Sequence, residues 1–199
     1  MAGEVKLTAN IPAEVKGISF LWRLCGISYI IAVPHIIVLC LKGIVFDIFA
    51  LISMFTILFS GTVPEGMWNF MTKYIRHLYY VSAWLLNFGG KYPKFDGEVD
   101  PDQPLQVEFV RPDKWRSLFG LLRMCGIVLL TLVPHIIIMF FWGFWVTILI
   151  VIGMIAGLFT GKWNESSSKT IVNFIRFEIR VICYIFCITD TYPPMNGKE

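Results

Sequence analysis

Two histidines are the side chains in this sequence best placed for chemistry. His35 follows Pro34 and His135 follows Pro134, each inside an apolar run, and Val-Pro-His-Ile-Ile occurs at both places. Two imidazoles on membrane helices form the ligand set of a b-type haem, and ionisable side chains inside a membrane are often functional. The structural interpretation is that each imidazole hydrogen-bonds a neighbouring helix or the carbonyl that its own proline leaves free. We therefore predict no resident cofactor, with haem or quinone binding as the alternative.

Basic side chains form a second candidate site, for the phosphates of lipid headgroups. Two lie where apolar stretches begin and four lie on later amphipathic segments: Arg23, Arg123, Lys73, Arg76, Arg176 and Arg180. The alternative is charge that only sets the orientation in a membrane. The sequence contains no nucleophile elbow, phosphate-binding glycine loop or histidine-rich metal signature. We therefore predict no catalytic residue, no metal site and a protein that is not an enzyme.

An internal repeat relates these residues, because many positions recur at an offset of 100 without a gap. The recurring residues interpreted as structural are Pro34 and Pro134, Gly61 and Gly161, and Tyr92 and Tyr192, the last followed by Pro193. Tandem units of this length form structural modules, and parallel repeats in a membrane are related by a pseudo-two-fold axis along its normal. The predicted domains are repeat 1 over residues 1–95, a linker over 96–104 and repeat 2 over 105–199.

Two apolar stretches place the repeats in a membrane. Residues 124–160 carry no charged side chain, and residues 24–60 carry only Lys42 and Asp47. Each stretch is too long for one crossing, which takes about 20 helical residues, and each has a glycine near its middle, Gly43 or Gly143. The sequence therefore predicts one transmembrane helical hairpin over about 18–60 and a second over about 118–160.

An amphipathic helix follows each predicted hairpin, over about 65–87 and about 165–188. A basic amphipathic helix is typical of one that lies in the membrane interface. A third crossing is the alternative, which Arg76 and Arg176 near the middle of these helices disfavour. Alternating residues at 4–9 and 105–110 predict two short strands that pair as a cytoplasmic β ribbon. The predicted fold is thus all-α and integral to the membrane, with four crossing and two interfacial helices.

The distribution of charge predicts the topology. Of 17 Lys and Arg residues, only Lys42 falls within the two apolar stretches, residues 24–60 and 124–160. The positive-inside rule then places the N-terminus, the central connector and the C-terminus in the cytoplasm. The segment up to Lys16 lacks the apolar core of a signal peptide, so the first hairpin is expected to direct insertion.

The order of these motifs resembles the DUF4389 family of prokaryotic membrane proteins. The matching residues are Pro34-His35, Pro134-His135, Phe159-Thr160-Gly161 and Asp190-Thr191-Tyr192-Pro193-Pro194. The first copy departs from the pattern, with Gly90 in place of Asp190 and Lys94 in place of the second proline. The resemblance implies a tandem pair of this module, as a multi-pass protein of a prokaryotic inner membrane. It implies no activity, because the family's function is unknown.

These features together predict a non-catalytic accessory or scaffold subunit of a larger membrane complex. Its expected partners are membrane lipids and larger integral membrane proteins or further copies of itself, and no nucleic acid. One alternative is a membrane-shaping protein, since short hairpins and amphipathic helices form a wedge in one leaflet. Another is a small transporter, or a lipid-, haem- or quinone-binding protein that uses His35 and His135.

Overall fold

The computed structural model describes residues 3–12 and 14–197. It is mostly helical, with one two-stranded sheet. Its elements are β1 (Val5–Ala9), α1 (Gly17–Leu24), α2 (Ile27–Ser60), α3 (Glu65–Leu85), β2 (Leu105–Phe109), α4 (Ser117–Met124), α5 (Ile127–Thr160) and α6 (Glu165–Ile185). The last four elements have the lengths of the first four and begin 100 residues later. The outermost residues of the two predicted repeats, 1–2 and 198–199, lie outside the described residues, as does residue 13.

The two apolar stretches fold differently from the prediction. Each forms one continuous helix of 34 residues, α2 or α5, so the predicted hairpins are wrong. Gly43 and Gly143 make room for neighbouring helices and do not turn the chain. A Cβ added to Gly43 would lie 3.2 Å from the Tyr74 hydroxyl, and one added to Gly143 would lie 3.2 Å from the Phe174 ring. A glycine in a long apolar run thus has two physical meanings, a turn or a close helix contact.

The chain bends instead just before each long helix. Gly26 and Gly126 have φ angles of +78° and +69°, a left-handed conformation that ends α1 and α4. The long helices themselves end at Gly61 and Gly161, which also have positive φ. Glycine adopts this conformation without steric cost, so these four glycines set both ends of α2 and α5.

The predicted β ribbon is confirmed. β1 and β2 pair antiparallel, with Val5 opposite Phe109 and Ala9 opposite Leu105. Leu7 and Val107 lie on the buried face of the ribbon and belong to the main core with residues of α3 and α6. On the opposite face Lys6, Thr8 and Glu108 are exposed and Gln106 is partly buried, in line with the alternation of strand side chains.

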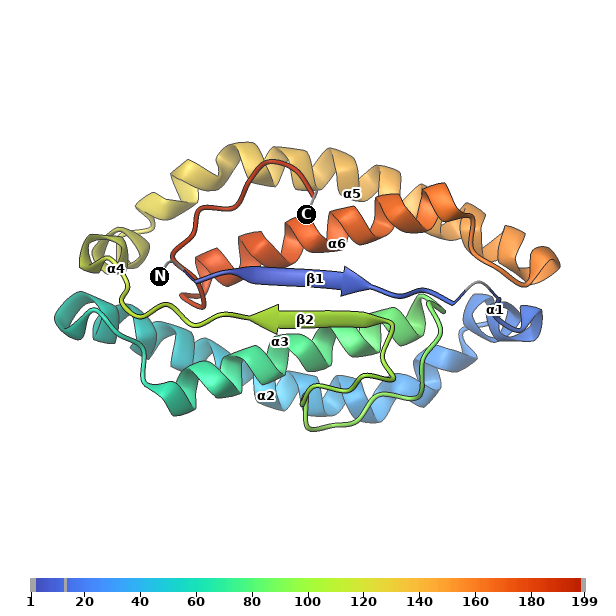
Figure 1. Cartoon of the computed structure of the whole chain (residues 1–199), viewed down its shortest axis with the longest axis horizontal. Coiled ribbons are helices and arrows are strands. Elements are labelled where there is room, and N and C mark those ends of the chain that lie inside the picture. The colour runs from blue at the N-terminus through green and yellow to red at the C-terminus, as the bar shows by residue number, and fades with distance from the viewer. Residues whose placement is uncertain (1–2, 13, 198–199) are drawn as a thin grey trace.

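The helices lie along the long axis of the molecule in pairs, α2 with α3 and α5 with α6 (Figure 1). The ribbon lies in front of α3 and α6, and the short helices α1 and α4 lie at opposite ends. α1 packs against α5 and α4 packs against α2, so each half of the chain holds the other. α2 and α5 form the layer remote from the ribbon, because the ribbon contacts α3 and α6.

α2 and α5 present a large apolar surface. One stripe of α2 is buried, and it consists of Ser28, Ala32, His35, Leu39, Phe46, Ala50, Ser53 and Ile57. Large apolar side chains elsewhere on α2 are exposed along its whole length, with Ile30 at 72%, Leu41 at 61% and Phe59 at 84%. Two segments, Ile27–Ser60 and Leu130–Thr160, are long and apolar enough to cross a membrane.

Candidate functional site

His35 contacts a third histidine, His77 of α3, which the sequence pattern did not indicate. His35 Nδ1 lies 2.8 Å from His77 Nε2, and neither side chain is exposed. The Phe95 ring stacks on His35 with centroids 4.0 Å apart. Burial, followed by the charge of Lys42, lowers the pKa of His77 to about 4. One imidazole of the pair therefore donates to the other, and His77 is uncharged at neutral pH.

His135 occupies the matching place in α5 and has different neighbours. Its Nε2 lies 2.9 Å from the Pro193 carbonyl oxygen, and its ring stacks on Phe177 with centroids 5.7 Å apart. Phe177 stands 100 residues after His77. This mismatch between the halves is the sequence signal by which His77 could have been found.

His35 and His135 thus have separate partners, and the structure does not bring them together as two ligands of one haem. His35 pairs with His77, and the Nε2 of His135 is already hydrogen-bonded. Over residues 3–12 and 14–197, His, Cys, Asp and Glu side chains form no group of three or more that could hold a metal ion.

Each Tyr-Pro motif lies against the proline-containing turn of a long helix. The Tyr92 hydroxyl donates to the Ile31 carbonyl oxygen at 3.0 Å, and the Tyr192 hydroxyl donates to the Thr131 carbonyl oxygen at 2.8 Å. These carbonyls lie three residues before each helix proline, in the turn where proline removes a backbone donor. The carbonyl that each proline leaves free lies one residue earlier, so each tyrosine bonds its neighbour in the same turn of the helix.

Arg76 and Arg176 face the ribbon, although they were predicted as lipid headgroup ligands. The Arg76 guanidinium donates to the Val107 carbonyl oxygen at 3.2 Å, and that of Arg176 donates to the Leu7 carbonyl oxygen at 3.0 and 3.1 Å. A further N–H of each arginine bonds the segment that follows its own helix. Both side chains are buried. Each arginine therefore fastens one strand to one inner helix.

The other predicted headgroup residues have protein partners in different places. Arg23 donates to the Trp84 carbonyl oxygen at 2.7 and 3.0 Å, near the end of α3. The Arg123 side chain is 1% exposed and lies 3.6 Å from the Asp190 carboxylate. Lys73 forms an ion pair with a carboxylate of the segment between α3 and β2. These cations are therefore spread over the molecule.

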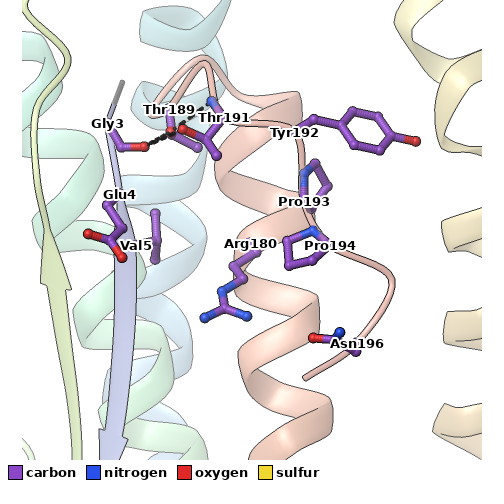
Figure 2. A pocket seen from close by; sticks show the side chains of 10 residues that line it. All are labelled: Gly3, Glu4, Val5, Arg180, Thr189, Thr191, Tyr192, Pro193, Pro194 and Asn196. Carbon is purple, nitrogen blue, oxygen red and sulfur yellow. Dashed lines mark hydrogen bonds between the residues drawn. The ribbon is translucent and has the colours of Figure 1, made fainter. Parts of the chain in front are cut away.

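A cavity of about 370 Å³ lies between β1, α6 and the C-terminal tail (Figure 2). The Tyr-Pro-Pro motif lines it, and Arg180 extends into it from α6. The hydroxyls of Thr189 and Thr191 donate to the Gly3 carbonyl oxygen at 2.7 and 2.6 Å. These bonds tie the tail to the start of the chain, so both threonine hydroxyls serve the fold.

The most extensive candidate site is the apolar surface of α2 and α5. Lys42 and Asp47 are the only charged residues in the two helices. The Lys42 ammonium group donates to the Phe95 carbonyl oxygen, so it is turned toward the segment between α3 and β2. A continuous exposed apolar surface is typical of sites of contact with a membrane or a protein partner.

Residues 125–196 match the model of a family described as a domain of unknown function, DUF4389. The matched segment contains α5, α6 and the Tyr-Pro-Pro tail. No curated protein and no solved structure matches the chain. The function must therefore be argued from the geometry of the molecule.

Proposed function

We propose that this protein is a monotopic membrane protein that inserts α2 and α5 into one leaflet and shapes the membrane as a wedge. The observation that carries the proposal is the apolar surface of these helices, which is exposed from end to end in the layer remote from the ribbon. A helix is about 10 Å across, so it fits within one leaflet of a hydrocarbon core about 30 Å thick.

The connectivity of the chain opposes a crossing by α2. β1 precedes α2 and β2 follows α3, yet the two strands pair along their whole length. A crossing by α2 alone would separate the strands. A return through α3 would carry the ribbon to the middle of the bilayer, because Arg76, which holds β2, lies near the middle of α3. Exposed Lys6 and Glu108 of the ribbon would then face hydrocarbon, at about 3 kcal/mol each on insertion scales.

The length of the helices supports the same arrangement. A helix of 34 residues is about 51 Å long, whereas the hydrocarbon core is about 30 Å thick. α2 is exposed and apolar at both ends as well as in its middle. When α2 lies in the plane of one leaflet, all of this apolar surface contacts lipid, as in other interfacial helices.

The two halves fit the proposal as copies of one module. Their elements match in length and offset, and their short helices pack on each other's long helices. A pseudo-two-fold axis along the membrane normal gives both copies the same depth and presents α2 and α5 to the same leaflet. Because no segment crosses in this arrangement, the ribbon stays on the side where the chain is made, the cytoplasm. The likeness of residues 125–196 to DUF4389 supports the inner membrane of a prokaryotic cell.

A second proposal, an accessory subunit of a larger membrane complex, is favoured by one feature of α5. Phe140, Phe141, Phe144 and Trp145 are exposed at 72%, 68%, 68% and 52%. Aromatic side chains are enriched at protein interfaces. Stable co-purification with a larger partner in mild detergent supports this proposal, and a chain that purifies alone counts against it.

Spin labels at three positions along α2 test the in-plane arrangement. Single cysteines replace Ile30, Ile44 and Phe59, on one face of α2, in a variant whose five native cysteines are replaced by alanine. In-plane insertion gives the same immersion depth at all three, measured from accessibility to oxygen and to a water-soluble nickel complex. A label at Lys6 of the ribbon is the aqueous control. A deep label at Ile44 with shallow labels at both ends would show a crossing helix and refute the proposal.

Liposomes test the wedge. Tubulation or constriction of vesicles is expected as the surface density of protein rises, because inclusions confined to one leaflet expand that leaflet alone. Vesicles that keep their shape with the protein fully bound would rule out membrane shaping and leave the monotopic arrangement standing.

A further inference from the structure

A groove lies between the two halves of the molecule. Its volume is about 630 Å³, within the range of about 300–1,000 Å³ that is usual for ligand sites. Its lining comes from the end of α3, the middle of α5, α6, and the corner between α1 and α2. Apolar side chains make up most of this lining.

Helix geometry shows which way the groove faces. Arg176 of α6 faces the ribbon, where it bonds the Leu7 carbonyl. Glu178 lies two residues further on, about 200° around the helix, and it lines the groove. At the rim, Tyr29 and Val151 are each 50% exposed, among the apolar side chains of α2 and α5. The groove therefore opens on the proposed membrane face.

Polar side chains in the groove are turned toward the protein. The hydroxyls of Ser82 and Thr147 each donate at 2.9 Å to a carbonyl in the preceding turn of their own helix. Glu178 is hydrogen-bonded to Tyr79, and burial raises the pKa of this carboxyl group, which favours its neutral form. The walls and floor thus suit an apolar occupant.

One cation stands at the end of the groove. Arg23 of α1 makes three hydrogen bonds to the carbonyl oxygens of Trp84 and Ser19. A guanidinium group carries five N–H donors, so donors remain for an anion. Trp22, its neighbour in α1, is 49% exposed, and tryptophan is enriched at the level of lipid headgroups. The end of the groove therefore suits an interfacial phosphate.

We propose that the groove holds one acyl chain of an anionic phospholipid, with the lipid phosphate bound to Arg23. This inference rests on the proposed in-plane insertion, which puts the surrounding lipid at the mouth of the groove. A peptide would leave backbone N–H and C=O groups unpaired against these apolar walls, whereas an acyl chain has no such groups. The occupant is therefore drawn from the leaflet in which α2 and α5 lie.

A photoactivatable lipid tests where the chain goes. The protein is bound to vesicles that contain phosphatidylglycerol with a diazirine at mid-chain, irradiated, and mapped by peptide mass spectrometry. Adducts are expected on Ile171 and Ile175, which line the groove and are only 1% and 5% exposed. Adducts confined to outer positions such as Ile44 and Leu51 would overturn the groove and leave the in-plane insertion intact. Absence of adducts on α2 as well would overturn both.

Two variants separate the acyl chain from the phosphate. Thr147→Trp fills the mouth of the groove and is expected to abolish the adducts on Ile171. Arg23→Gln is expected to weaken retention of phosphatidylglycerol at least about tenfold in native mass spectrometry, as loss of a charge-assisted hydrogen bond predicts. Arg116→Gln, at a side chain that is 74% exposed, is the matched control with unchanged retention.

Each variant must first float with vesicles and keep its helical circular dichroism. Given that, unchanged adducts in Thr147→Trp overturn the groove assignment, and unchanged retention in Arg23→Gln overturns the phosphate assignment.

Discussion

Exchanging one residue between the two halves is expected to move an acid sensitivity from one half to the other. His77→Phe gives α3 the residue that α6 carries at Phe177, and Phe177→His makes the reverse change. Both side chains are fully buried. Each ring also contacts a histidine of a long helix, with centroids 5.1 Å apart for His77 and His35 and 5.7 Å apart for Phe177 and His135. The exchange therefore changes polarity more than packing.

Proton linkage gives the size of the effect. The pKa of His77 is lowered from 6.5 to about 4 by burial first, then by Lys42 and His35, with Asp96 opposing. As the pH falls below about 6.5, the unfolded chain binds a proton that the folded protein refuses until about pH 4. The contribution of His77 to the free energy of unfolding is therefore fully present above pH 6.5. It is lost as the pH falls toward 4, by up to about 1.4 kcal/mol per pH unit. From pH 7 to pH 5 the loss reaches at most about 2 kcal/mol.

Urea unfolding in detergent micelles at pH 7 and pH 5, followed by helical circular dichroism, measures this loss. The wild-type protein is expected to lose up to about 2 kcal/mol more than His77→Phe over this interval, and Phe177→His is expected to add a loss of the same sign. An unchanged pH dependence in His77→Phe would show that the folded protein protonates His77 near its ordinary pKa. The interpretation that the buried pair of His35 and His77 is uncharged in the folded protein would then be refuted.

Three further predictions concern the ribbon, the helix packing and the tyrosine contact. Arg176→Met is expected to cost about 2–4 kcal/mol, because charge-assisted bonds contribute about 1.5–3 kcal/mol each, and to speed hydrogen exchange in β1; unchanged exchange there would contradict its fastening role. Gly153→Ala places a Cβ 2.2 Å from the Trp163 ring and is expected to cost about 1–3 kcal/mol in unfolding experiments. Its control is Gly66→Ala, where a Cβ meets nothing within 4 Å, and equal effects would dismiss the packing argument. Tyr192→Phe removes one hydrogen bond to α5 and is expected to cost about 1 kcal/mol, so a thermal midpoint identical to wild type would show that this bond is not needed.

Local pattern was sufficient to predict the positions of the ribbon and of α3 and α6, whereas α1 and α4 were merged into the predicted hairpins. The 3.6-residue period and the offset of 100 placed helices over 65–87 and 165–188, and the structure has Glu65–Leu85 and Glu165–Ile185. Alternation, clear over 105–110 and weaker over 4–9, placed both strands of the ribbon. The long helices were misjudged because Gly43 contacts another helix, Tyr74 of α3 being 31 residues away in sequence. A local pattern contains no information about such a contact.

The site residues were harder to predict for the same reason. His35 was recognised as unusual, but its partner His77 lies 42 residues away on another helix, and no spacing rule joins them. Arg76 was weighed as a charge against a bilayer, whereas its partner is the Val107 carbonyl of the ribbon, 31 residues away. Sequence patterns identify which side chains need a partner, and the tertiary fold decides which partner each one finds.

The two halves differ in chemistry around the histidine of each long helix. In the proposed duplication, three residues around His35 have apolar counterparts 100 residues later: Phe177 for His77, Trp142 for Lys42 and Met195 for Phe95. His77 and Phe95 contact the His35 ring, and Lys42 bonds the Phe95 carbonyl. These three differences therefore lie together, where the segment between α3 and β2 lies on α2. Acid is accordingly expected to loosen that segment first, while the tail held on α5 by Tyr192 stays in place. Hydrogen exchange at pH 5 that rises equally in both segments would argue that the two halves respond as one unit.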